Sequence, residues 1–129
     1  MVLAALLLSV GGRALAQDLA QELSVEPRNT ASLEALIAAG ESGEDYVLID
    51  VRTPREYADG HLPTAINIDH REIADGLAEM DRDQPIVLYC RTGNRSGRAD
   101  RTLRRMGFTN VVDFGGIIHW DGRVTTDSE

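Results

Sequence analysis

The chain contains no lysine, because all 13 of its basic residues are arginines. This absence excludes chemistry that passes through a lysine Schiff base. Basic residues are also in the minority, since 21 acidic residues give the chain a formal charge of -8. A nucleic-acid-binding surface needs an excess of basic side chains to displace counterions from phosphates. We therefore exclude nucleic acid as a partner.

Cysteine is nearly absent as well, and Cys90 is the single thiol among 129 residues. No disulfide can form within the chain, so this thiol is metal-bound, catalytic, or buried and inert. His70 and His119 lack metal-ligand spacing with each other and with Cys90. We therefore predict no metal site.

Long hydrophobic runs are few. Residues 2–10 are almost wholly apolar, but the run is too short for a membrane span and Arg13 interrupts its continuation. Residues 14–16, Ala-Leu-Ala, resemble a small-residue cleavage site, although the basic residues that normally precede such a signal are missing. We predict a signal peptide over residues 1–16, export to the periplasm, and a single domain over 17–129. The alternative is a cytoplasmic protein with an ordinary N-terminal helix.

Apolar runs alternate with helical periodicity along the rest of the chain. We predict strands at residues 46–51, 64–68, 85–90 and 110–114, and helices at 29–40, at 69–80 with Asp69 and Glu72 in capping-box spacing, and at 95–107. Such alternation favours right-handed crossovers and a parallel sheet with helices on both faces. The functional site of such a sheet lies at the carboxyl ends of its strands, where Asp50 and Cys90 fall.

The segment LYCRTGNRSGRAD, residues 88–100, places Cys90 between a predicted strand and a predicted helix. A loop in this position gathers backbone N–H groups, and the helix dipole adds positive potential that favours a thiolate. Arg91 and Arg95 add positive charge, and Gly93 permits a turn that a side chain would block. We interpret Cys90 as a nucleophile toward an anionic substrate. The alternative is a structural cysteine that ends a core strand, with solvated arginines beside it.

Three segments, VLIDVRTPREYADGHLPTAINI, IVLYCRTGNRS and GGIIHW, resemble the rhodanese family and occur in the order that this family shows. The similarity extends from about residue 30 to about residue 120. It implies an α/β fold with a five-stranded parallel sheet and helices on both faces. The strand without a clear sequence signal would lie near residues 23–25.

The resemblance also implies sulfurtransferase chemistry that needs no metal or organic cofactor. Cys90 would attack the outer sulfur of thiosulfate, a small anionic donor, release sulfite and become a persulfide. Cyanide, a thiol or a thioredoxin-like protein would then remove the sulfur. The loop residues expected to bind the donor or the persulfide are Arg91, Thr92, Gly93, Asn94, Arg95 and Ser96.

Three further residues match the family's motifs and are expected to support the site. We expect Asp50 to brace the loop, Arg52 to pair with Glu56, and His61 to fix a turn. Within the loop, we expect Arg95 to reach the donor or the thiolate, and Arg91 to point outward. The arginines of the last predicted helix are interpreted as a solvated face, with docking of an acidic partner as the alternative.

Two other functions remain as alternatives. Dual-specificity phosphatases and arsenate reductases of related fold require a Cys-x5-Arg loop. Here Ser96 occupies that final position and the arginine, Arg95, comes one residue early. The second alternative is a non-catalytic rhodanese-like interaction module. Many such modules have lost the cysteine, whereas this chain retains it.

Overall fold

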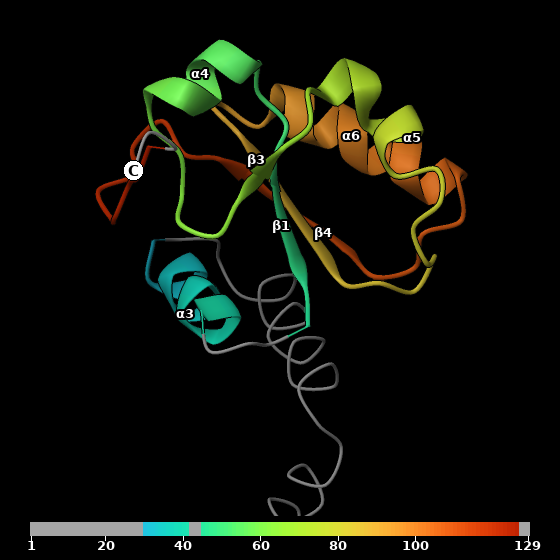
Figure 1. Cartoon of the computed structure of the whole chain (residues 1–129), viewed down its shortest axis with the longest axis horizontal. Helices are drawn as coiled ribbons and strands as arrows, with labels where there is room; N and C mark the ends of the chain where they lie inside the picture. The colour runs from blue at the N-terminus through green and yellow to red at the C-terminus, as the bar shows by residue number, and fades with distance from the viewer. Residues whose placement is uncertain (1–29, 42–44, 127–129) are drawn as a thin grey trace, which may run out of the picture.

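The computed structural model describes residues 30–41 and 45–126 (Figure 1). Its elements in chain order are α3 (Thr30–Glu41), β1 (Val47–Asp50), α4 (Pro54–Asp59), β2 (Ile66–Asn67), the 3₁₀ helix η1 (His70–Glu72), α5 (Ile73–Gly76), β3 (Ile86–Cys90), α6 (Asn94–Arg105) and β4 (Val111–Gly116). The predicted signal peptide and the predicted strand near residues 23–25 lie outside the described residues. None of the helices in the described ranges is long and apolar enough to cross a membrane.

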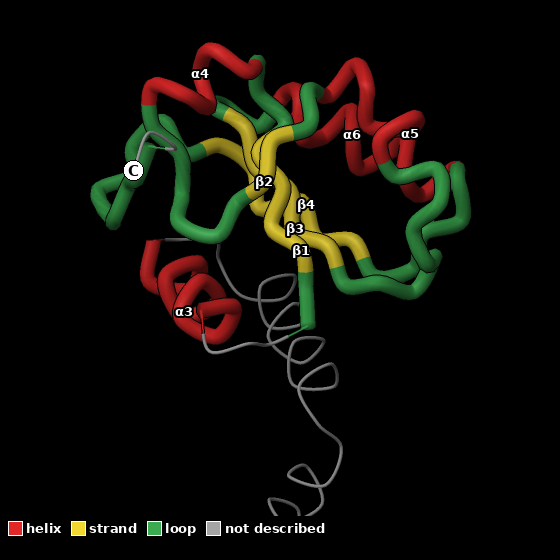
Figure 2. Tube along the Cα trace, in the orientation of Figure 1, coloured by secondary structure: helices red, strands yellow, loops and turns green. Residues whose placement is uncertain are grey.

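The strands form one parallel sheet in the order β2-β1-β3-β4 (Figure 2). The described part of the chain thus contributes four strands to the predicted parallel sheet. Because parallel strands end at the same edge, the last residues of β1 and β3, Asp50 and Cys90, lie at one edge of the sheet. In the β1–β3 register, Asp50 is opposite Tyr89.

Helices cover both faces of the sheet, which confirms the predicted α/β architecture (Figure 1). On one face, Leu48 and Val87 pack in the same core as the apolar side of α3. On the other face, Ile49 and Leu88 pack with α5 and α6, and Cys90 belongs to this second core. Alternate residues of each strand thus enter different cores, which explains why β1 and β3 are apolar without alternation. Burial of each large side chain contributes about 1.5–3 kcal/mol.

The predicted helix over residues 69–80 is too long, because only residues 70–76 are helical and they divide into η1 and α5. Asp69 caps only η1, where its carboxylate accepts the Arg71 N–H, and α5 ends after a single turn at Gly76. Asp75 and Gly76 have low helix propensity, and Gly76 packs closely against the Ile68 side chain. The capping box of the structure lies instead at the start of α4, between Thr53 and Glu56.

Candidate active site

The Cys90 thiol lies at the end of β3 and has no exposed surface. Its sulfur accepts the backbone N–H of Gly93 at 3.0 Å and that of Ser96 at 3.4 Å. The thiol donates to Ser96 Oγ at 3.6 Å, and this hydroxyl in turn donates to the Gly93 carbonyl at 3.3 Å. The loop thus directs two backbone donors at the one sulfur, an arrangement that also suits a charged sulfur.

Gly93 makes this curvature possible. Its φ of 103° lies in the left-handed region, where a Cβ would be strained, and it is the N-cap of the 12-residue helix α6. The Gly97 N–H donates to the Gly93 carbonyl at 3.1 Å and so begins the helix. The amino end of α6, with the positive end of its dipole, is therefore next to the sulfur.

Strand β4 passes directly beneath the loop. A Cβ on Gly116 would lie 2.5 Å from the Thr92 carbonyl carbon and 2.7 Å from the Arg91 carbonyl oxygen. The Ile117 N–H donates to the Cys90 carbonyl at 3.1 Å, next to this contact. Glycine is required here because the two backbones touch. Sequence reasoning used this glycine only as part of a motif and missed its contact with the loop.

Arg95 is bound to α4. Its Nη1 lies 2.7 Å from Glu56 Oε1 and its Nη2 lies 3.0 Å from Glu56 Oε2. The same carboxylate accepts the Thr53 N–H at 3.0 Å within the capping box. Hydrogen bonding from Arg95, the largest cause, lowers the pKa of Glu56 to about 2. Glu56 in turn raises the pKa of Arg95.

The expected pairing of Arg52 with Glu56 is therefore wrong. Arg52 binds Asp50, two residues before it, because both side chains are enclosed behind α4. A T-x-x-E capping box at residues 53–56 was visible in the sequence and would have identified Glu56 as part of the helix start.

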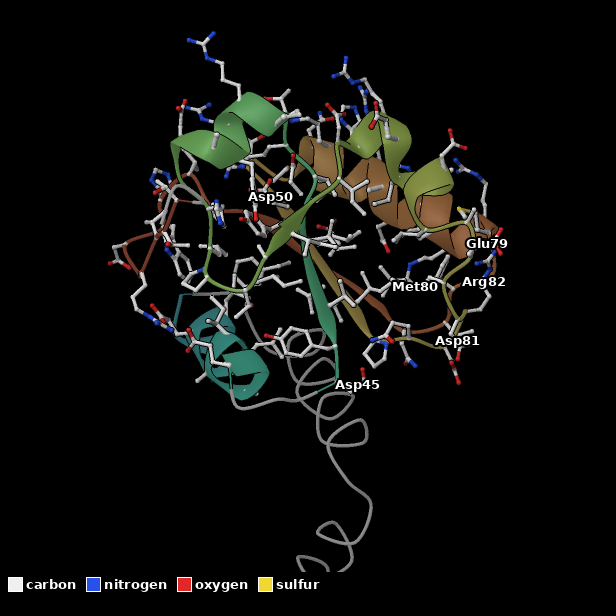
Figure 3. The ribbon with its side chains drawn as sticks, in the orientation of Figure 1. Asp45, Asp50, Glu79, Met80, Asp81 and Arg82 are labelled. Atoms are coloured by element: carbon white, nitrogen blue, oxygen red, sulfur yellow. The ribbon has the colours of Figure 1, made fainter. Side chains whose placement is uncertain are left out.

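A buried polar network surrounds Asp50, which has no exposed surface and lies beneath α4 (Figure 3). Its carboxylate accepts the Arg52 backbone N–H at 2.9 Å, Arg52 Nη2 at 2.6 Å and the Tyr89 hydroxyl at 2.8 Å. The Tyr89 hydroxyl also accepts the Leu62 N–H at 3.0 Å, and Arg52 Nη2 donates to the Gly60 carbonyl at 2.8 Å. Burial, and then the charge of Asp50, raise the pKa of Tyr89 above its usual range. Asp50 thus braces the residue that precedes the thiol.

The remaining predicted site residues differ in their exposure and in their contacts. Arg91, Thr92 and Asn94 are exposed on the outer side of the loop. His61 is buried at the connection between α4 and β2, where its Nδ1 donates to the Tyr57 carbonyl at 2.8 Å and its ring stacks on Tyr57. These contacts, together with the backbone bonds between His61 and Thr125, hold the connection between α4 and β2 in place.

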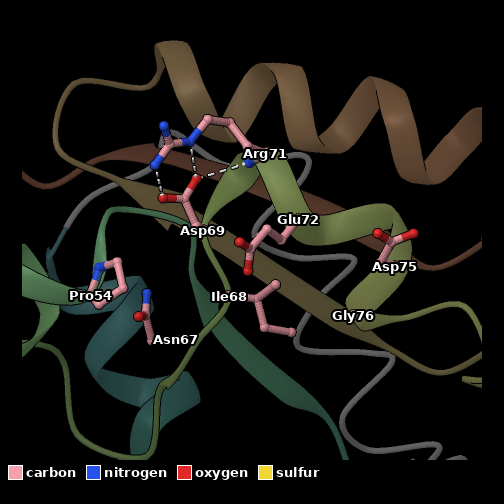
Figure 4. A pocket seen from close by; sticks show the side chains of 8 residues that line it. All are labelled: Pro54, Asn67, Ile68, Asp69, Arg71, Glu72, Asp75 and Gly76. Carbon is pink, nitrogen blue, oxygen red and sulfur yellow. Dashed lines mark hydrogen bonds and ion pairs between the residues drawn. The ribbon is translucent and has the colours of Figure 1, made fainter.

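No group of three or more histidine, cysteine, aspartate and glutamate side chains is arranged to hold a metal ion within residues 30–41 and 45–126. An open cleft of about 660 Å³ lies beside the start of α4 (Figure 4). Its lining is Pro54, Asn67, Ile68, Asp69, Arg71, Glu72, Asp75 and Gly76. Asp69 and Arg71 form an ion pair there, and hydrogen bonding from Arg71 lowers the pKa of Asp69 to about 2. Because Glu72 and Asp75 also line the cleft, its net charge is negative. The cysteine loop does not line it.

A profile of the rhodanese-like domain matches residues 30–122. The chain belongs to the rhodanese-like domain family. A sulfurtransferase of Allochromatium vinosum is 40% identical over 78 residues, which are 60% of this chain and 73% of that protein. The thiosulfate sulfurtransferase PspE of Escherichia coli K12 is 38% identical over 71 residues, 54% of this chain and 68% of that protein.

Among solved structures, a rhodanese with anions from E. coli superposes with a TM-score of 0.56 at 32% identity. The match covers 63% of this chain and 98% of that one. The family and these relatives support a sulfurtransferase-type function for the rhodanese-like domain described here.

The ion pair between Glu56 and Arg95 should make stability depend on acid pH. Because the pKa of Glu56 in the folded protein, about 2, is below its ordinary 4.5, the pair stabilises the fold above pH 4.5 and is lost as the pH falls toward 2. Glu56→Gln keeps the capping-box acceptor but removes the charge, so we expect a loss of ~1 kcal/mol at neutral pH. Urea unfolding at several pH values should show this difference shrinking in acid. A difference that does not change with pH would contradict the assignment.

The Tyr89 hydroxyl should contribute to stability through the buried network. Tyr89→Phe leaves the Leu62 N–H without its acceptor and removes one donor from Asp50, so we expect a loss of about 1–3 kcal/mol. Tyr57→Phe removes the bond that the part-buried Tyr57 hydroxyl donates to the Ala65 carbonyl, and serves as the matched control with a smaller loss. Equal losses in urea unfolding for the two variants would count against a special role of the network.

Gly116→Ala should distort the loop, because its Cβ would overlap the backbone of Thr92. We expect a loss of about 1–3 kcal/mol and a changed rate of Cys90 alkylation. Gly97→Ala is the control: its Cβ would meet only ordinary contacts, with Arg101 Nη1 of α6 and Asp113 Oδ2 of β4, both at 3.7 Å, so stability should stay equal or rise by up to ~1 kcal/mol. Thermal unfolding of both variants tests this prediction. A wild-type melting temperature for Gly116→Ala would refute the close contact between the Gly116 and Thr92 backbones.

Proposed function

We propose that the protein is a sulfurtransferase that moves sulfane sulfur from thiosulfate through a Cys90 persulfide to a thiophilic acceptor. The observation that carries this proposal is the Cys90 sulfur, which receives the N–H groups of Gly93 and Ser96 at the amino end of α6. It is the chain's only thiol, in a domain whose relatives include proteins named thiosulfate sulfurtransferase.

In the first step, the Cys90 thiolate attacks the outer sulfur of thiosulfate. A new S–S bond forms at Cys90 as the sulfur–sulfur bond of thiosulfate breaks, and sulfite leaves with the electron pair of that bond. The enzyme then carries a persulfide, whose negative charge the N–H groups of Gly93 and Ser96 and the dipole of α6 stabilise.

In the second step, an acceptor attacks the outer sulfur of the persulfide. Cyanide leaves as thiocyanate, whereas a thiolate acceptor becomes a persulfide itself. In both cases the S–S bond at Cys90 breaks and its electron pair returns to the Cys90 sulfur. The reaction needs no outside oxidant or reductant, since the sulfur atom changes only its partner.

The two loop arginines have different roles in this proposal. Both Nη atoms of Arg95 are engaged by Glu56, so Arg95 mainly holds the first turn of α6 against α4. Arg91 is exposed and supplies long-range attraction for an anionic donor. Because Cys90 has no exposed surface, the loop around the sulfur has to open for a donor to enter.

A phosphatase or arsenate reductase is the less favoured function. Such an enzyme uses an arginine at the position of Ser96, but here this residue is buried and bonded to the sulfur. The neighbouring arginine is neutralised by Glu56. The end of the loop therefore lacks a free arginine that could bind a tetrahedral oxyanion.

The intact mass of the protein tests the proposal. Incubation with thiosulfate should add the mass of one sulfur atom, and cyanide should then remove it with release of thiocyanate. Cys90→Ser should show neither change, while aryl phosphates should not be hydrolysed by the wild type. An unchanged wild-type mass in the absence of reducing agents would reject thiosulfate as donor, and rapid phosphate release would favour the phosphatase.

A further inference from the structure

The arginines of the described residues fall into three groups according to their partners. In the described part of the chain, those with a carboxylate oxygen within 3.0 Å are Arg52, Arg71, Arg95, Arg104 and Arg123. Arg82 donates instead to several backbone carbonyls. Those that form no ion pair with the described residues are Arg55, Arg91, Arg98, Arg101 and Arg105.

Apart from Arg55 in α4, the arginines of the third group, which have no ion pair, lie in the cysteine loop or on the helix that follows it. Arg91 follows the thiol, and Arg98, Arg101 and Arg105 recur at helical spacing along one exposed side of α6, the helix that begins at the loop. The opposite side of α6 is buried against the sheet through Ala99 and Leu103. We call Arg91, Arg98, Arg101 and Arg105 the arginine face.

A shortage of carboxylates does not explain these unpaired charges, because the chain has 21 acidic residues for 13 arginines. Like charges at this spacing repel one another and weaken a helix. The guanidinium of Arg101 reaches back toward Gly97, one turn from the loop, and forms no ion pair with the nearby Asp113. Unpaired charge of one sign beside a reactive group is typical of a surface that attracts a partner of opposite charge.

We propose that the arginine face docks an acidic acceptor protein whose thiol takes the sulfur from Cys90. This inference rests on the proposed function and names its acceptor. A compact acidic surface fits better than an extended polyanion such as nucleic acid or an anionic membrane. The reason is that η1 packs against α6, and the acidic cleft with Glu72 and Asp75 repels any polyanion that extends past the helix (Figure 4).

The transfer itself follows the second step given above. The acceptor thiolate attacks the outer sulfur, the S–S bond to Cys90 breaks, and Cys90 keeps the electron pair while the acceptor leaves as a persulfide. The arginine face takes no part in bond breaking. It raises the rate at which an acidic acceptor reaches the loop, and this effect falls with ionic strength.

Single-turnover sulfur transfer to two short synthetic peptides tests the proposal. Each peptide has one cysteine, surrounded by glutamates in one and by lysines in the other, and their intrinsic thiol reactivities are normalised with a small disulfide. At low salt we expect the acidic peptide to react about tenfold faster, and the ratio should approach one at high salt. 2-Mercaptoethanol, whose only charge is that of its reacting thiolate, should depend on salt much less than the acidic peptide does.

Three substitutions locate the effect. Arg98→Gln and Arg101→Gln should each slow transfer to the acidic peptide by about two- to fivefold and leave transfer to 2-mercaptoethanol unchanged. Arg123→Gln removes the same charge from the exposed C-terminal segment, where Arg123 pairs with Glu41 of α3, and should change neither rate. Equal losses for all three variants would overturn the proposal, because they would reflect net charge alone.

Binding of the labelled acidic peptide to Cys90→Ser separates this inference from the proposed function, since it needs no sulfur chemistry. If thiosulfate forms no persulfide, the proposed donor fails, but salt-sensitive binding that Arg98→Gln weakens would still support the docking surface. If the persulfide forms and the two peptides react and bind equally, the docking surface is refuted and the sulfurtransferase stands. Tighter binding of a single-stranded DNA oligonucleotide than of the acidic peptide would also overturn the proposal.

Discussion

The Asp50 carboxylate, which has no exposed surface, is the constraint on which the edge of the sheet depends. A buried charge costs several kcal/mol unless hydrogen bonds replace its lost water. Arg52 and the Tyr89 hydroxyl supply these bonds, and each of them also binds the chain between α4 and β2. One anion therefore joins β1, this connection and β3. It also holds the side chain of Tyr89, the residue before Cys90, and so restricts the position of the thiol.

Two further contacts shape the loop that this base supports. Glu56 holds Arg95 and so ties the first turn of α6 to α4. Gly116 lets β4 approach the loop from below. These two contacts restrict the conformation of the loop, whose Gly93 and Ser96 N–H groups point toward the sulfur. Positive potential at the thiol then comes mainly from backbone N–H groups and the dipole of α6, while the uncompensated arginine side chains lie outside, where a partner can meet them.

Sequence reasoning identified the strands, the parallel sheet and the position of Cys90 because these depend on local pattern. A continuous apolar run predicts a strand buried on both faces, and helices between such strands require parallel pairing. It made the helix over 69–80 too long. The prediction relied on the capping-box spacing of Asp69 and Glu72 and gave too little weight to the low helix propensity of Asp75 and Gly76. It also failed for Arg52, because an i, i+4 pairing assumes one helix, and Arg52 lies before α4 begins.

The amino-acid sequence by itself determined the α/β class, the family, and the placing of a lone thiol at a strand end before a glycine-containing loop. Each of these features depends on neighbouring residues or on the order of motifs along the chain. Only the tertiary structure decided which polar groups from distant parts of the chain meet. Arg95 and Glu56 are 39 residues apart in the chain, as are Asp50 and Tyr89. Nearby carboxylates pair with Arg52 and Arg104, but no local pattern selects Glu56 for Arg95; packing of α4 over the loop does. Arg98, Arg101 and Arg105 of α6 form no ion pair with the described residues.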